Sequence, residues 1–123
     1  MGLPYRDLIA WKKWMMLARE VYRLSPKLPR EEIYGMRSQL TRAAVSIPSN
    51  IAEGWTRETD RDRAHFLAIA HGSLAETETL CEEMGWFSVT DTQTHHSLLS
   101  EVSRILGALR RQLRSRLNSE PRS

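Results

Sequence analysis

Apolar residues recur at steps of three and four positions in four separate stretches of the chain, and this periodicity most limits the folds open to it. The stretches run from Pro4 to about Leu24, from about Glu31 to Glu53, from Thr59 or Asp60 to about Met84, and from Thr90 to about residue 117. No stretch shows a convincing strand-like alternation. Four helices of this length with short connections predict an all-α fold, an antiparallel up-down four-helix bundle.

Prolines and glycines mark the expected helix ends. The sequence SPKLPR at residues 25–30 ends the first helix, because proline has no N–H to continue the hydrogen-bond ladder. Pro48 lies inside the second helix and is expected to kink it. Gly54 is expected to end that helix as a C-terminal cap, and Gly85 is expected to stop the third helix.

Each expected helix has an apolar face that predicts part of the core. The first helix has two neighbouring faces, more than one partner helix needs: Leu8, Trp11, Met15, Ala18 and Tyr22, and beside them Trp14, Leu17, Val21 and Leu24. The face of the second is Ile33, Leu40, Ala44, Ile47 and Ile51. The face of the third is Phe66, Ile69, Ala70, Ser73, Leu74, Thr77, Leu80, Cys81 and Met84. The face of the fourth is Leu98, Val102, Ile105, Leu109 and Leu113.

A chain of 123 residues is the size of one domain. We expect residues 1–117 to form the bundle and residues 118–123 to form a polar flexible tail. Cys81 is the single cysteine, so no intrachain disulfide is possible, and a reducing cytoplasm is the expected compartment. No stretch approaches the roughly 18 consecutive apolar residues that span a bilayer, so no membrane partner is expected.

Charge is unevenly distributed along the chain. The net charge is +3, but residues 1–30 and 92–123 are basic and residues 31–91 are acidic. This distribution suits a polyanion such as RNA or DNA, or a second copy of the same chain. The residues expected to bind nucleic-acid phosphates are Lys12, Lys13, Arg104, Arg110, Arg111, Arg114 and Arg116. The alternative is a solvated face whose charges favour the C-terminal dipole of the last helix.

A polar face on the second helix is the most unusual local pattern. Its members are spaced three or four apart: Gln39, Arg42, Ser46, Asn50 and Glu53. One interpretation is a solvated surface. The other is that Arg42 and Glu53 help to fix a subunit contact or the kink at Pro48, with short neighbours such as Ala43 allowing close helix approach.

The sequence lacks the patterns that catalysis, cofactors and metals require. Asp62-x-x-His65 occurs once and Glu-x-x-His does not occur, whereas bundle di-iron sites use paired Glu-x-x-His motifs. Cys81 lies on an apolar face, where a buried, unreactive thiol is expected. Glycine-rich phosphate loops are also missing. We therefore expect a protein that is not an enzyme, with no cofactor and no metal.

Three segments resemble a known family. They are YRDLIAWKKW from Tyr5, IYGMRSQLTRAAVSIPSNIAEG at residues 33–54 and HFLAIAHGSLAETETL at residues 65–80. They are similar to the bacterial four-helix-bundle proteins encoded in intervening sequences of 23S rRNA genes, and to the accessory variability proteins of diversity-generating retroelements.

The resemblance implies an up-down bundle that assembles into a ring-like homopentamer with a central channel. For retroelement members it implies nucleic-acid binding and association with a reverse transcriptase. It supplies no catalytic residues. The motif positions that it links to fold and assembly are Gln39, Arg42, Ser46, Pro48, Asn50, Glu53, Gly54, Gly72, Ser73 and Glu76.

Two hypotheses of function follow. The first is a non-enzymatic homo-oligomeric bundle that binds nucleic acid through Lys/Arg-rich surfaces, with weak sequence preference and strong salt dependence. The second is a structural scaffold or adaptor that docks a protein partner and uses its basic flank for self-assembly. A cryptic hydrolase or metal protein is a third hypothesis, which the missing motifs disfavour.

Overall fold

The computed structural model describes residues 9–28, 33–83 and 89–119, and it shows four α-helices and no strand among them. The helices are α1 (Ile9–Leu24), α2 (Ser38–Trp55), α3 (Asp60–Glu78) and α4 (Val89–Ser119). Three shorter helical segments accompany them: the 3₁₀ turn η2 (Ser25–Lys27) and the π-helical segments η4 (Ile33–Arg37) and η5 (Thr79–Glu83). The all-α four-helix fold is therefore confirmed.

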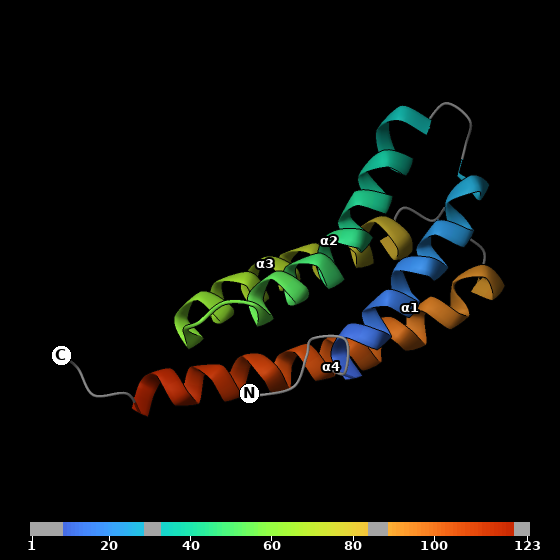
Figure 1. Cartoon of the computed structure of the whole chain (residues 1–123). Coiled ribbons are helices and arrows are strands. Elements are labelled where there is room, and N and C mark those ends of the chain that lie inside the picture. Colours follow the sequence, from blue (N-terminus) through green and yellow to red (C-terminus); the bar gives the residue numbers. More distant parts are fainter. Residues whose placement is uncertain (1–8, 29–32, 84–88, 120–123) are drawn as a thin grey trace.

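The helices pack around one core in the order of the chain (Figure 1). α1 packs against α2 and α4, and α3 packs against the same two helices. Contacts between α2 and α3 pair their residues in opposite order: Gln39 bonds Glu76, and Ser46 bonds Ser73. These two helices are therefore antiparallel. Figure 1 also shows that the C-terminal half of α4 extends beyond the N-terminal end of α1.

Side chains and backbone close the helix ends between α2 and α3. α3 begins at Asp60, where Thr59 or Asp60 was expected to open it, and the Thr59 side chain caps it by accepting the Asp62 N–H. The prediction that Gly54 caps α2 is wrong. The helix continues to Trp55, with Thr56 as its C-cap. Gly54 instead lies against α3, where a Cβ would be 3.0 Å from the Phe66 Cβ. Gly85 lies outside the described residues.

Pro48 lies inside α2 and is buried. Since it lacks an N–H, the carbonyl four residues earlier loses its helical donor. Figure 1 shows α2 changing direction near its middle, which is the region of Pro48 in the sequence. The kink expected from the sequence therefore has a counterpart in the fold.

The last helix runs past residue 117, where the bundle was expected to end. α4 continues through Ser119, and the Ser119 hydroxyl donates to the Arg116 carbonyl at 3.0 Å. This bond provides a partner for a carbonyl of the last turn, where a helix lacks backbone donors. The rest of the expected tail, residues 120–123, lies outside the described residues.

The buried core selects among the apolar faces predicted from the sequence. Of the two faces on α1, the one with Trp14, Leu17, Val21 and Leu24 is fully buried. On α3, Leu67 is fully buried whereas Ile69 is 40% exposed, so Ile69 was wrongly placed in the core. On α4, Leu106 is fully buried, and the predicted Ile105 and Leu109 are only partly buried against the core.

Candidate functional site

Five of the motif residues meet between α2 and α3 and form a polar seam: Gln39, Ser46, Asn50, Ser73 and Glu76. The Ser46 and Ser73 hydroxyls are hydrogen-bonded at 2.8 Å. The Asn50 amide donates to the Ser46 hydroxyl at 2.9 Å and to the Ser46 carbonyl at 2.7 Å. Gln39 donates to a carboxylate oxygen of Glu76 at 3.0 Å. This part of the polar face lies against a neighbouring helix.

The other two residues of the polar face lie outside this network. Glu53 is exposed and pairs with Arg57 one turn later at 2.8 Å. Arg42 is exposed, and its Nε donates to the Ser38 carbonyl at 3.4 Å. Arg42 also lines a shallow polar hollow of about 220 Å³ together with Gln39, Ser46, Ser73 and Glu76. The polar seam therefore joins α2 to α3, and Arg42 and Glu53 lie at its exposed edge.

Four of the predicted phosphate-binding arginines lie on one side of α4. At 100° per residue, Arg104, Arg110, Arg111 and Arg114 fall within an arc of roughly 120°. Arg110 is half-buried and the other three are exposed. Within the described residues, none of the four has a carboxylate partner. We call these four residues the α4 arginine face.

Hydrogen-bonding groups lie beside this face near the end of α4. Arg111 and Arg114 line a shallow hollow with Ser115, Asn118 and Ser119. Arg111 also lies over Gly107, where an added Cβ would be 3.2 Å from a guanidinium nitrogen. Guanidinium, hydroxyl and amide groups all donate hydrogen bonds to phosphate oxygens. The local chemistry therefore suits a phosphate backbone.

Arg116 differs from its neighbours because it is engaged inside the fold. Its Nε and Nη2 donate to the two carboxylate oxygens of Asp60 at 3.0 and 2.7 Å. Arg63 donates to the same carboxylate at 3.1 Å. These bonds join the end of α4 to the start of α3. The hydrogen bonds from Arg116 are the largest cause that lowers the pKa of Asp60 below its ordinary value.

The two lysines of α1 differ from each other in their partners. Lys13 pairs with Glu101 of α4 at 3.3 Å, so its charge is matched inside the chain. Lys12, the residue before Lys13, is exposed and points 100° away from it around the helix. Along α4, Glu101 lies about 5 Å before Arg104 and about 20 Å before Arg114. Packing thus divides the seven predicted cations into the α4 arginine face, two paired residues and one separate lysine.

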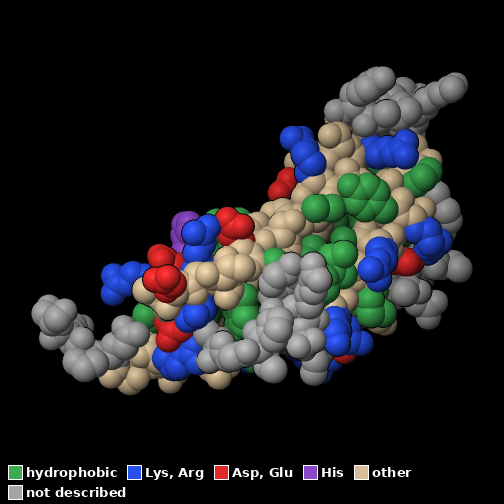
Figure 2. Space-filling view, in the orientation of Figure 1, with side chains coloured by type: hydrophobic (Ala, Val, Ile, Leu, Met, Phe, Trp, Pro, Cys, Tyr) green, Lys and Arg blue, Asp and Glu red, His purple; other side chains and the backbone are tan. Residues whose placement is uncertain are grey.

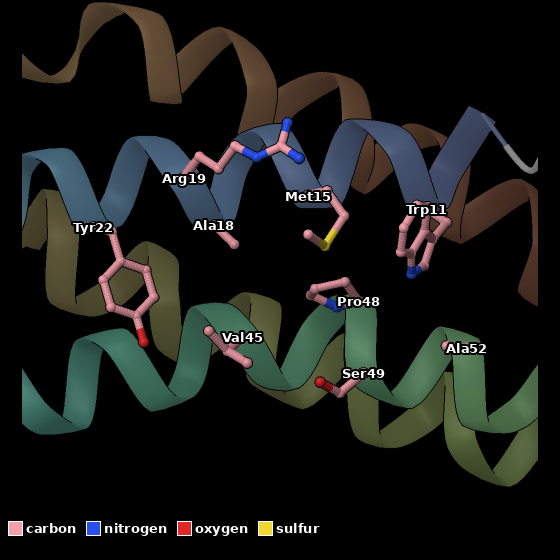
Figure 3. A pocket seen from close by; sticks show the side chains of 9 residues that line it. All are labelled: Trp11, Met15, Ala18, Arg19, Tyr22, Val45, Pro48, Ser49 and Ala52. Carbon is pink, nitrogen blue, oxygen red and sulfur yellow. The ribbon is translucent and has the colours of Figure 1, made fainter. Parts of the chain in front are cut away.

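An apolar groove runs between α1 and α2. Figure 2 shows hydrophobic side chains gathered over these helices, with Lys and Arg side chains around them. The groove encloses about 570 Å³. Figure 3 shows Trp11, Met15 and Tyr22 of α1 facing Val45, Pro48 and Ala52 of α2. The second apolar face of the first helix was the signal for this groove, because only one face could enter the core.

No group of three or more His, Cys, Asp and Glu side chains with the spacing of a metal site occurs in the described parts of the chain. Cys81 is buried in the core. Among the described helices, none is long and apolar enough to cross a membrane.

Comparison with known proteins decides the family. The family model described as 23S rRNA-intervening sequence protein matches residues 6–111. The chain belongs to this family. The match covers α1, α2, α3 and most of α4, so it includes the polar seam and three of the four arginines of the α4 arginine face. A search of curated proteins found no match to the chain.

Proposed function

We propose that this member of the 23S rRNA-intervening sequence protein family is a non-enzymatic, homo-oligomeric, cytoplasmic bundle that binds RNA or DNA through its phosphates. The observation that carries the proposal is the α4 arginine face, with four cations on one side of one helix and no carboxylate partner in the described residues. Arginine forks match phosphate oxygens, and a helix holds them at fixed spacing. Phosphate contacts carry no sequence information, so sequence preference should be weak.

The test is a titration of the purified protein against structured RNA and duplex DNA at about 50 and 200 mM salt. If binding neutralises six or more phosphates, the affinity should fall by about 10³-fold or more between the lower and the higher salt concentration. An oligomer reaches such a number because each copy contributes four arginines. No binding at the lower salt would contradict the proposal.

A matched pair of variants tests whether the α4 arginine face is the contact. Arg111→Ala/Arg114→Ala should weaken binding and reduce the log–log salt slope by about one unit for each lost contact. Arg57→Ala/Arg61→Ala removes the same charge from the connection between α2 and α3 and the first turn of α3, and should leave most of the binding. Equal losses in both variants would indicate a general charge effect and contradict this site.

A second candidate function is a scaffold that docks a protein partner, a reverse transcriptase in a retroelement setting. The apolar groove between α1 and α2 favours it, because exposed apolar grooves commonly accept a helix of another chain. Absence of salt-dependent nucleic-acid binding together with an intact oligomer would make this the leading function.

A further inference from the structure

Three of the four large hydrophobic side chains that are exposed in the described residues lie on two separate surfaces. Tyr22 is 53% exposed and Val45 is 37% exposed, and both line the groove between α1 and α2. Ile69 is 40% exposed on the outer face of α3. One surface is a groove and the other is a helix with one projecting apolar side chain, so their shapes are complementary.

The outer face of α3 is narrow enough to approach another helix closely. Ile69, Gly72 and Glu76 follow one another at steps of three and four, and all three are exposed. An added Cβ at Gly72 would meet no atom within 4 Å. Glycine inside a helix costs about 1 kcal/mol relative to alanine, and packing within one chain gives no reason for it here. A close neighbour from outside the chain would supply that reason.

The charges of the two surfaces are complementary. Arg19 lines the groove and is exposed, and Lys12 lies two turns earlier on the same side of α1. Among the residues that the structure describes, no carboxylate forms an ion pair with Arg19 or Lys12. On this face of α3, Glu76 is exposed, and one of its carboxylate oxygens also accepts from Gln39 at 3.0 Å. Two grooves facing each other would bring like charges together, whereas a groove facing α3 brings opposite charges together.

We propose that the groove between α1 and α2 receives the outer face of α3 from a second copy of this chain. Ile69 enters the groove beside Tyr22 and Val45, Gly72 lets the two backbones approach, and Glu76 comes near Arg19. This proposal rests on the homo-oligomeric part of the proposed function and specifies its contact. Because the two faces belong to different helices, the contact is heterologous, and repeating it closes a ring when the rotation permits.

The test uses variants of each face in the full-length chain. Tyr22→Glu/Val45→Glu alters the groove, and Ile69→Lys or Gly72→Lys alters the face of α3. All four positions are exposed, so the bundle should keep its helical circular dichroism. The controls Ser100→Glu/Ser103→Glu and Ser100→Lys make the same charge changes on exposed positions of α4. Light scattering should give an oligomer for wild type and both controls, and the mass of one chain for each altered face.

Mixing the two classes of variant gives the decisive result. A groove variant retains a normal α3 face, and an α3 variant retains a normal groove, so together they should form a complex of one chain of each. The self-association constant of each variant alone should weaken at least tenfold. Assembly that survives Ile69→Lys and Gly72→Lys would overturn the proposal while leaving homo-oligomerisation in place, and so would a mixture that forms no complex. A monomeric wild type would overturn both.

Discussion

The guanidinium of Arg116 holds both carboxylate oxygens of Asp60, across 56 positions of sequence, with donor–acceptor distances of 3.0 and 2.7 Å. This bidentate pair joins the last turns of α4 to the first turn of α3. It also removes Arg116 from the set of arginines that are free to meet a phosphate.

Replacing Arg116 should therefore affect stability more than nucleic-acid binding. Arg116→Ala leaves the Asp60 carboxylate with Arg63 alone, and we expect the free energy of unfolding to fall by about 1–2 kcal/mol. Arg114→Ala, two residues earlier on an exposed position, should leave stability unchanged and weaken binding instead. Denaturant unfolding and a salt titration of both variants check this. The reverse pattern would contradict the division of roles.

The stabilisation that Asp60 provides should be lost at low pH. The pKa of Asp60 is lowered in the folded chain, first by the hydrogen bonds from Arg116, with burial acting in the opposite direction and Arg63 adding to the lowering. A carboxylate with a lower pKa when folded stabilises the fold above its unfolded pKa, near about 3.9. That stabilisation is lost as pH falls through the folded pKa. The Tm difference between wild type and Asp60→Asn should be constant near neutral pH and shrink below about pH 4. A difference that stays constant to pH 2 would count against this.

The contact between α2 and α3 should not accept a side chain at Gly54. A Cβ there would be 3.0 Å from the Phe66 Cβ and 3.5 Å from the Arg63 carbonyl oxygen. We expect Gly54→Ala to destabilise by about 1–3 kcal/mol, because neither neighbour is the end of a flexible chain. Gly107→Ala is the control, since its nearest neighbour is the mobile guanidinium of Arg111 and its helix propensity improves. Equal effects in thermal unfolding would contradict the packing role of Gly54.

Leu67 and Ile69 should differ sharply in their contribution to the core. Leu67 is fully buried, so Leu67→Ala should lower the free energy of unfolding by about 2–5 kcal/mol. Ile69 is 40% exposed, so Ile69→Ala should cost the fold of one chain less than about 1 kcal/mol. Denaturant unfolding at protein concentrations low enough to dissociate oligomers makes the comparison. Similar losses would show that α3 is rotated relative to this structure.

The bond between the Ser46 and Ser73 hydroxyls should appear as a coupling energy. In a double-mutant cycle with alanine at each position, we expect about 0.5–1.5 kcal/mol of coupling, since the removal of either hydroxyl leaves the other short of a partner. The distant exposed pair Ser100 and Ser115 should give a coupling within about 0.5 kcal/mol of zero. No coupling between Ser46 and Ser73 would mean that the seam does not stabilise the contact of α2 with α3.

Local chemistry made much of the fold predictable. Helical spacing predicted the four helices and the start of α3 at Thr59 or Asp60, where the Thr59 cap reaches only three residues along the chain. The spacing of Ser46 and Asn50 predicted their shared face for the same reason. The end of α2 was harder, because the role of Gly54 depends on how closely Phe66 approaches from another helix.

The sequence by itself determined that this chain forms four helices, that α1 ends at Leu24 and α3 begins near Asp60, and that positive charge gathers near the end of α4. Only the tertiary structure decided which of the two apolar faces of α1 is buried and which remains as a groove. It also decided that Lys13 and Arg116 are paired, while the α4 arginine face has no carboxylate partner within residues 9–28, 33–83 and 89–119. The physical reason is that hydrogen bonds within a helix are set by neighbours along the chain, whereas burial and ion pairing depend on helices that are distant in sequence.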